Sequence, residues 1–518
     1  MGVPEEDRKD WLLGDPEAMG PPVPTPRWMK VKQSMGSCGW KKKVKITLGV
    51  LASSLILFAV LGGFDCSSSH KVYEIIDRDP VREPSMSDAG QLEWQPTDGC
   101  RNTPHVFPKY TAPVKFGRRR KLGLQQTFDR KAGARLPRVA GQIVLRPAAG
   151  DGAASKEAGT IELEVISNDE RLRVQVDADL GGDNQRLRVT VPQAPAGGES
   201  AEGACVQMRA TVWIPRHAFL RRLRLEAVHL DVELADGLVL GVADCAKIST
   251  VVGDVRSGSG ADADADAGRP APYTLQSPKL AVETVSGRIA GWFPLYSRLK
   301  LRTASGDVDA RVAPKPHPGG RSKARLDVAS LSGAVKVAEP LPAAAAAGRP
   351  GAALPARWYQ TRLSSMSGDV EARLATNCDS RFKTVSGKLD LELLPVLDPA
   401  IDKKGSIRTE TKSGDVSLKV LEPVWVAGSD GERRRHSLDR LRARHRSISG
   451  DLALAYPPSW EGAFTAKTLA GDIDVAGDGL DVVRRGGPIA RFVEGRKGSG
   501  DSRIRMETVS GNVNLTVG

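Results

Sequence analysis

A short phrase occurs ten times in the second half of the sequence, and this repeat restricts what the chain can fold into. Its consensus is apolar-x-Thr-x-Ser-Gly-Asp-Val-x-Leu-x-Val, and residues 407–420 are a good example. Side chains of one kind recur at every second position on both sides of the glycine, which is the period of a strand with one buried face. Each phrase therefore predicts two short strands joined by a turn. The glycines of these repeat turns are Gly253, Gly287, Gly306, Gly333, Gly368, Gly387, Gly414, Gly450, Gly471 and Gly511.

Two folds fit such a phrase. The turn can close a two-residue hairpin in an antiparallel meander, or it can form a corner at which each phrase stacks on the next one as coils of a β-solenoid. Stacked side chains lie about 4.8 Å apart, and like charges directly opposite each other destabilise a pair. Through Asp415 no two aspartates follow the glycine in consecutive phrases, which favours stacking, although Asp415, Asp451 and Asp472 break the pattern. We therefore predict an all-β fold, a β-solenoid-like stack of repeated short strands, and keep the meander as the alternative.

The repeated T-x-S-G-[DN]-[VI] strands resemble the "putative adhesin" family, a β-solenoid-like domain of unknown function. The resemblance covers roughly residues 125–518, and the chain is similar to membrane-anchored members of this family in fungi. It implies the fold. It does not imply an activity, because one fold can host many functions.

The N-terminal part of the chain differs in composition from the repeats. Residues 1–45 are predicted to be a disordered tail, which carries seven basic and no acidic residues between 27 and 45. The next 19 residues, 46–64, are uncharged and long enough to span a bilayer, so we expect a transmembrane signal anchor. The basic flank predicts a cytoplasmic N-terminus, with the repeats luminal or extracellular. Residues 65–135 read as a proline-rich stalk, and 136–518 as the adhesin-like domain, with irregular first coils at 136–245 and repeats at 246–518.

Two further features of the predicted lumenal part concern processing and cross-linking. The basic run Arg118–Lys121 is either a solvated loop or a processing-protease site. Cys205 with Cys245 is a candidate disulfide within the first coils, and Cys66 with Cys100 is one within the stalk, although spacing alone does not determine pairing.

The sequence contains no motif typical of a metalloprotease, a thiol redox protein, an α/β-hydrolase or a P-loop nucleotide-binding protein. We therefore expect no catalytic residue, no metal and no cofactor. Four tryptophans between the phrases are candidates for a ligand platform, because aromatic faces bind sugar rings; the alternative is that they cover edges of the solenoid. They are Trp292, Trp358, Trp425 and Trp460.

The formal net charge of +13 favours acidic partners. We expect contact with membrane lipid through 46–64, a cell-wall polysaccharide or a surface protein as ligand, and no nucleic acid. The sequence thus predicts a single-pass membrane protein that displays a non-catalytic β-solenoid for adhesion, cell-wall attachment or scaffolding. The alternative is a carbohydrate-active β-helix enzyme at the cell surface.

Overall fold

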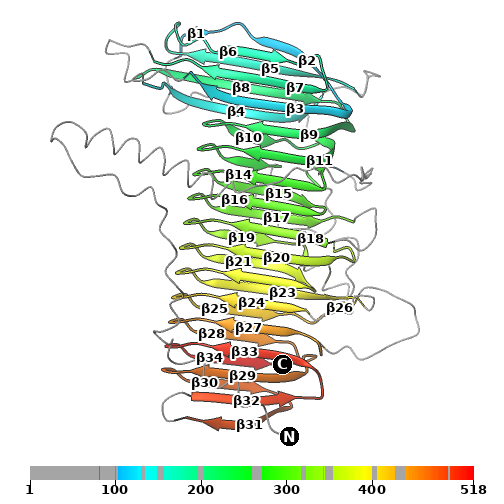
Figure 1. Cartoon of the computed structure of the whole chain (residues 1–518), viewed down its shortest axis with the longest axis vertical. Helices are drawn as coiled ribbons and strands as arrows, with labels where there is room; N and C mark the ends of the chain where they lie inside the picture. Colours follow the sequence, from blue (N-terminus) through cyan, green and yellow to red (C-terminus); the bar gives the residue numbers. More distant parts are fainter. Residues whose placement is uncertain are drawn as a thin grey trace, which may run out of the picture. The chain divides into compact units, whose positions relative to one another are not determined.

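The structure is all-β, and its strands form two large sheets. The computed structural model describes residues 81, 100, 103–129, 135–148, 157–194, 203–258, 271–316, 323–341, 344, 354–398, 405–425, 438–487 and 491–518. We call the two sheets sheet I and sheet II. In Figure 1 the strands of both sheets lie one above another from β1 to β31.

Sheet I holds the strands that follow the repeat turns. At one end, β1 (His105–Val106) and β2 (Tyr110–Lys115) both pair with β5 (Ala158–Ser167). From β5 the order continues through β8 (Cys205–Ile214), β4 (Arg138–Pro147), β10 (Asp231–Leu234), β12 (Val255–Ser257), β15 (Ile289–Leu295), β17 (Val308–Pro314), β19 (Val335–Ala338), β21 (Val370–Thr376), β23 (Leu389–Leu397), β25 (Val416–Val420), β28 (Leu452–Tyr456), β34 (Val513–Val517) and β30 (Ile473–Gly477). The short strand β26 (Val424–Trp425) follows β25 end to end, and both pair with β23.

Sheet II holds the strands that precede the repeat turns. Its order is β6 (Gln175–Asp179), β7 (Asn184–Val191), β3 (Gly117–Phe128), β9 (Ala218–Glu226), β11 (Val239–Ser249), then β13 (Thr274–Gln276) and β14 (Lys279–Glu283) end to end along β11, β16 (Arg298–Arg302), β18 (Lys323–Ala329), β20 (Trp358–Ser364), β22 (Asp379–Lys383), β24 (Ser406–Glu410), β27 (Arg442–Arg446), β33 (Ser502–Glu507), β29 (Gly462–Thr468), β32 (Arg491–Lys497) and β31 (Leu480–Gly486).

One phrase makes one coil: a strand of sheet II, the Ser-Gly turn, and a strand of sheet I. Equivalent strands of neighbouring coils pair in parallel and in register, for example Leu299 with Leu326 and Val308 with Val335. The two strands of a phrase therefore belong to different sheets, which excludes the antiparallel meander for the repeats. Alternate side chains point inward, and those of both sheets form one hydrophobic core.

In most phrases the buried threonine or serine links one turn to the next. Its side-chain oxygen accepts a hydrogen bond from the amide of the glycine three residues later, as Thr303 does from Gly306 at 3.0 Å. The same hydroxyl donates to the glycine carbonyl of the neighbouring coil, here Gly287 at 3.3 Å. The turns approach so closely that a Cβ on Gly306 would lie 1.9 Å from the Gly287 carbonyl oxygen. Glycine is required at this position because no side chain fits between the turns.

The aspartates that follow the glycines also join adjacent coils. The Asp369 carboxylate accepts the amide of Lys388 at 2.7 Å, and the Asp415 carboxylate accepts the amide of Asp451 at 2.9 Å. Five of the six aspartates accept such a backbone donor from the neighbouring coil, which compensates for repulsion between stacked acids. This bond explains why Asp415 and Asp451 can follow the glycines of consecutive coils, although repulsion between their charges would by itself disfavour that arrangement.

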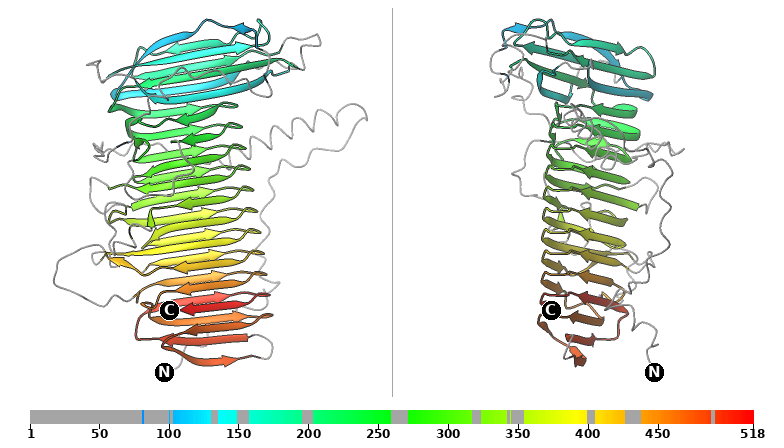
Figure 2. Two further views of the ribbon diagram at one scale, coloured as in Figure 1. Left: turned by 180° about the vertical axis from the view of Figure 1, so that it is seen from behind. Right: turned by 60° about the vertical axis from the view of Figure 1, so that its left-hand side comes forward.

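Both ends of the stack depart from chain order. The C-terminal strands β33 and β34 are inserted between β27 and β29 in sheet II and between β28 and β30 in sheet I (Figures 1 and 2). At the other end β3 lies between β7 and β9, and β4 between β8 and β10. The expectation that each phrase stacks on its neighbour in sequence is therefore wrong for the last coils. Antiparallel strands follow these inserted coils: β5 and β6 at one end, β31 and β32 at the other.

The segment expected to be a stalk is in part folded into the sheets. Strands β1, β2 and β3 all lie before residue 136, and β3 is an interior strand of sheet II. The basic run Arg118–Lys121 belongs to β3, so it lies in a strand and not in a loop. Arg120 pairs with Asp183 at 3.0 Å, and Arg118 lies over the Phe219 ring.

The disulfides differ from the predicted pairs. Cys205 is bonded to Cys100, 105 residues earlier. Cys245 is disulfide-bonded as well, to a cysteine other than Cys205, and Cys378 is free. The pairing follows from the antiparallel contact of β1 with β5, which brings the chain before His105 next to the start of β8. Because that contact joins segments far apart in the sequence, the pairing cannot be predicted from the cysteine spacing.

Among the residues that the structure describes, none forms an apolar helix of membrane-spanning length. The predicted tail 1–45 and the predicted span 46–64 lie outside the described residues.

Candidate anion-binding face

The four tryptophans expected to form a ligand platform do not lie together. Trp292 is on β15 and Trp425 on β26, both in sheet I, whereas Trp358 is on β20 in sheet II. Trp460 is fully buried and packs against Tyr456. Trp292 is half-buried, meets Tyr273 edge to face and has Lys315 over its ring. Trp292 and Trp460 thus pack against buried tyrosines, and the four tryptophans come from different strands and a turn.

A row of arginines on the outer face of sheet II is the most distinctive surface feature. The register pairs Arg362 of β20 with Arg381 of β22, Arg381 with Arg408 of β24, Arg408 with Arg444 of β27, and Arg444 with Arg505 of β33. Five arginines thus occupy the same position in five adjacent coils, at a spacing of about 4.8 Å. We call this row the arginine ladder. It ends at Asp327 on one side and at Thr465 on the other.

The strand pattern points these side chains outward. The residues flanking each arginine, such as Ile407 and Thr409 around Arg408, are buried, and alternation along a strand sends the residue between them to the opposite face. Arg362, Arg381, Arg408 and Arg444 are exposed, and Arg505 is partly exposed.

Only part of this positive charge is neutralised within the protein. Arg381 pairs with Asp379 at 3.0 Å, and Arg505 pairs with Glu507. Glu507 also receives Arg446 at 2.6 Å and Arg444 at 3.7 Å, so one carboxylate serves three guanidinium groups. Arg362 and Arg408 form no ion pair with any described residue.

The two faces of the same five coils differ in charge. Strands β20, β22, β24, β27 and β33 carry nine Lys or Arg and three Asp or Glu. Their continuations in sheet I, β21, β23, β25, β28 and β34, carry two basic and three acidic residues. The basic excess is therefore confined to the sheet II face.

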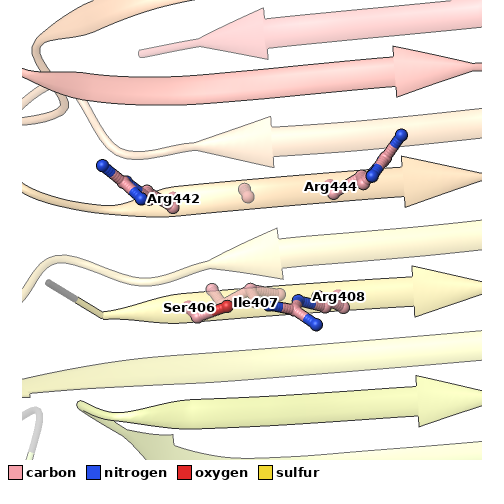
Figure 3. Close-up of a pocket in the computed structure, with 6 residues that line it drawn as sticks. Ser406, Ile407, Arg408, Arg442 and Arg444 are labelled. Atoms are coloured by element: carbon pink, nitrogen blue, oxygen red, sulfur yellow. The ribbon is translucent and has the colours of Figure 1, made fainter.

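Two surface hollows lie on the arginine ladder. One, of about 280 Å³, is lined by Arg408 of one strand and by Arg442 and Arg444 of the next (Figure 3). The other, of about 300 Å³, is lined by Arg362, Arg381 and Lys383 among others.

The strongly perturbed titratable groups lie inside the stack. Burial raises the pKa of Glu339 to about 8, although the Ala375 amide donates to its carboxyl at 2.8 Å. Burial lowers the pKa of Arg357 to about 10 and that of His445 to about 3. Arg357 donates to backbone carbonyls, and His445 bonds Thr409 and Tyr456. Because these groups are buried and bonded, they serve the fold. The described residues also hold no cluster of three metal-ligating side chains.

The arginine ladder has a sequence signal that the repeat analysis did not use. In five phrases an arginine lies three residues before the conserved Thr or Ser, in R-L-S-S, R-F-K-T, R-T-E-T, R-H-R-S and R-M-E-T. The pattern predicts five outward arginines. It does not show that they are adjacent, because Arg505 reaches Arg444 only through the inserted C-terminal coil.

No family model matches the sequence, and no curated protein matches it. Three solved structures are similar to this chain. A "putative cell adhesion protein" from Clostridium sporogenes is 7% identical, with 79% of this chain and 99% of that chain covered and a TM-score of 0.18. A "putative adhesin" from Parabacteroides distasonis is 10% identical (61% of this chain and 94% of that chain covered, TM-score 0.21), and one from Parabacteroides merdae is 9% identical (62% of this chain and 96% of that chain covered, TM-score 0.14). At these TM-scores the likeness carries no argument about function, so the proposal below rests on residues of this chain.

Proposed function

We propose that this chain is a non-catalytic adhesion or scaffolding protein, a membrane-anchored β-solenoid that holds an anionic partner on the outer face of sheet II. Segment 46–64 would be the anchor, and the coils would lie on the luminal or extracellular side. A basic flank before an apolar segment supports that orientation. A stack of coils keeps side chains in fixed rows, which suits many weak contacts made at once.

The arginine ladder is the observation that carries the proposal. Like charges stacked in adjacent strands repel one another and cost stability. The neighbouring aspartate column is relieved by backbone donors, but Arg362 and Arg408 have no carboxylate among the described residues. Guanidinium groups bind carboxylate, sulfate and phosphate through paired N–H donors. An external anionic partner would therefore stabilise a row that the protein leaves uncompensated.

The test is retention of the full-length chain, held in lipid nanodiscs, on cell-wall material and intact cells of the organism that carries the gene. The ladder variant is Arg362→Gln with Arg408→Gln. The matched control is Arg373→Gln with Lys419→Gln, which removes the same charge from the same two coils on sheet I. We expect the wild type and the control to be retained, and the ladder variant to bind at least about a hundredfold more weakly, since it loses two charged contacts worth about 1.5–3 kcal/mol each.

Two outcomes would contradict the proposal. Equal retention of the ladder variant and the control would show that adhesion does not use this face. Release of soluble sugar in the same tubes by the wild type would instead favour the carbohydrate-active enzyme.

A further inference from the structure

We infer that the ligand of the arginine ladder is a linear acidic polysaccharide with a carboxylate on every sugar, bound lengthwise along the stack and across the strands. This inference rests on the proposed function and specifies its ligand. Its basis is the match between a straight row of evenly spaced guanidinium groups and a polymer whose charges are equally regular.

The spacing of the row selects a polymer. Five rungs at about 4.8 Å place the first and last arginines about 19 Å apart. A single small anion reaches one or two of these rungs. An extended polyuronate advances by about one coil per sugar, so that its carboxylates recur at the interval of the guanidinium groups and the long arginine side chains can reach them from below and from the side. An oligomer of about five sugars covers all five rungs at this spacing.

The flanks of the row select a narrow ligand. Asp379 lies beside Arg381, and Glu410 lies on the other side of the ladder, two residues beyond Arg408. A flat anionic membrane would press against these carboxylates as well as against the arginines, and like charges would repel. A chain one sugar wide contacts the arginines and leaves the acids in solvent.

The ends of the row limit the length of the contact. Asp327 occupies the next rung beyond Arg362 and pairs with Arg302 at 3.2 Å, so it closes that end to an anion. Thr465 occupies the rung beyond Arg505. Two further exposed arginines, Arg442 and Arg503, stand beside each other in the adjacent row at this end and form no ion pair with described residues. They add donors where the polymer leaves the ladder.

The experiment is calorimetric titration of the full-length chain in nanodiscs of neutral lipid with oligogalacturonates from dimer to decamer. Affinity should rise at least tenfold from the dimer to the pentamer or hexamer and then change by less than about twofold, because further sugars lie beyond the ladder. Methyl-esterified oligomers of equal length should not bind. The Arg362→Gln, Arg408→Gln variant should lose the length dependence, whereas the Arg373→Gln, Lys419→Gln control should keep it.

Three results would overturn the inference. Equal affinity for dimer and hexamer would indicate a point-anion site, as would competition by inorganic phosphate at equal carboxylate concentration. Binding to phosphatidylserine vesicles without binding to oligomers would indicate a membrane surface. Cell retention that depends on the ladder, without oligogalacturonate binding, would leave the proposed function intact and reject only this ligand, while loss of both would reject the proposed function.

Discussion

At the scale of the residue, each repeat turn is stabilised by the hydroxyl of its Thr or Ser and by a glycine, whose lack of a side chain lets the neighbouring turn approach. The hydroxyl of Thr384 accepts the amide of Gly387 at 3.1 Å and donates to the Gly368 carbonyl at 3.2 Å. The bond to the Gly368 carbonyl requires the two turns to be in near contact, which only glycine permits. The threonine is fully buried, so each bond also satisfies a polar group that water cannot reach.

The Gly387→Ala substitution should therefore destabilise the protein strongly. The new Cβ would lie 2.2 Å from the Gly368 carbonyl oxygen, and two coils would have to separate to admit it. We expect the free energy of unfolding to fall by about 3 kcal/mol, at the upper end for overpacking. Gly181→Ala is the control, because nothing lies within 4 Å of its Cβ position, and it should change stability by less than about 0.5 kcal/mol. Chemical denaturation of both variants measures this; equal effects would contradict the close-contact explanation.

His445 should make stability depend on pH. Burial lowers its pKa to about 3 in the folded protein, whereas an unfolded histidine titrates near about 6.5. The folded state therefore favours the neutral ring, and the stabilisation is present above pH 6.5 and is lost as the pH falls from there towards 3. Between pH 6.5 and pH 4.5 the free energy of unfolding should drop by about 2 kcal/mol through this group.

The comparison that isolates His445 is with His445→Gln, since carboxylates titrate in the same range. Urea denaturation at several pH values should show a shallower acid loss for the variant. Parallel pH profiles for the two proteins would mean that His445 is protonated in the folded state, contrary to its burial between Thr409 and Tyr456.

At the scale of the element, the inserted coils give both ends of the folded region the same arrangement. Strand β34 has partners on both sides, β28 and β30, although it is the last strand of the chain. Strand β31 pairs with β32 alone among the described strands, and its residues are mostly exposed. A terminal strand held inside a sheet cannot fray without breaking two ladders of hydrogen bonds.

Hydrogen exchange on the full-length chain tests this arrangement. Amides of β34 should exchange at least tenfold more slowly than those of β31, and at rates close to those of β28, because opening β34 requires a larger unfolding event. A stack in chain order would give the reverse pattern, with β34 as a fast-exchanging edge strand. Peptides from the interior strand β23 serve as the slow reference within the same experiment.

At the scale of the whole molecule, the two sheets share a core but have different outer surfaces. Inward positions are set by packing and are alike in both sheets, whereas outward positions are not constrained by the core and can hold binding residues. Sheet II concentrates arginine in one row, and sheet I has mixed charges on the same coils. The fold thus converts a repeat in sequence into a straight row in space.

The strands, the turns and the buried side chains of the repeats can be predicted from the sequence. Thr284, Gly287 and Ile289 have these roles because alternation and the need for a small residue at a crowded turn are local properties. The arginine three residues before the Thr or Ser is likewise visible in the sequence, and its outward direction follows from the alternation. These features depend on neighbours along the chain, which periodicity records.

Which strands are neighbours depends on the tertiary structure. Ten phrases with the same alternation can pair in many orders at similar local energy, so the insertion of β34 beside β28 depends on contacts made far along the chain. The same holds for the Cys100–Cys205 bond and for Arg505, which completes the arginine ladder only because β33 lies next to β27. Non-local pairing is selected by the packing of the complete stack, and no single phrase contains that information.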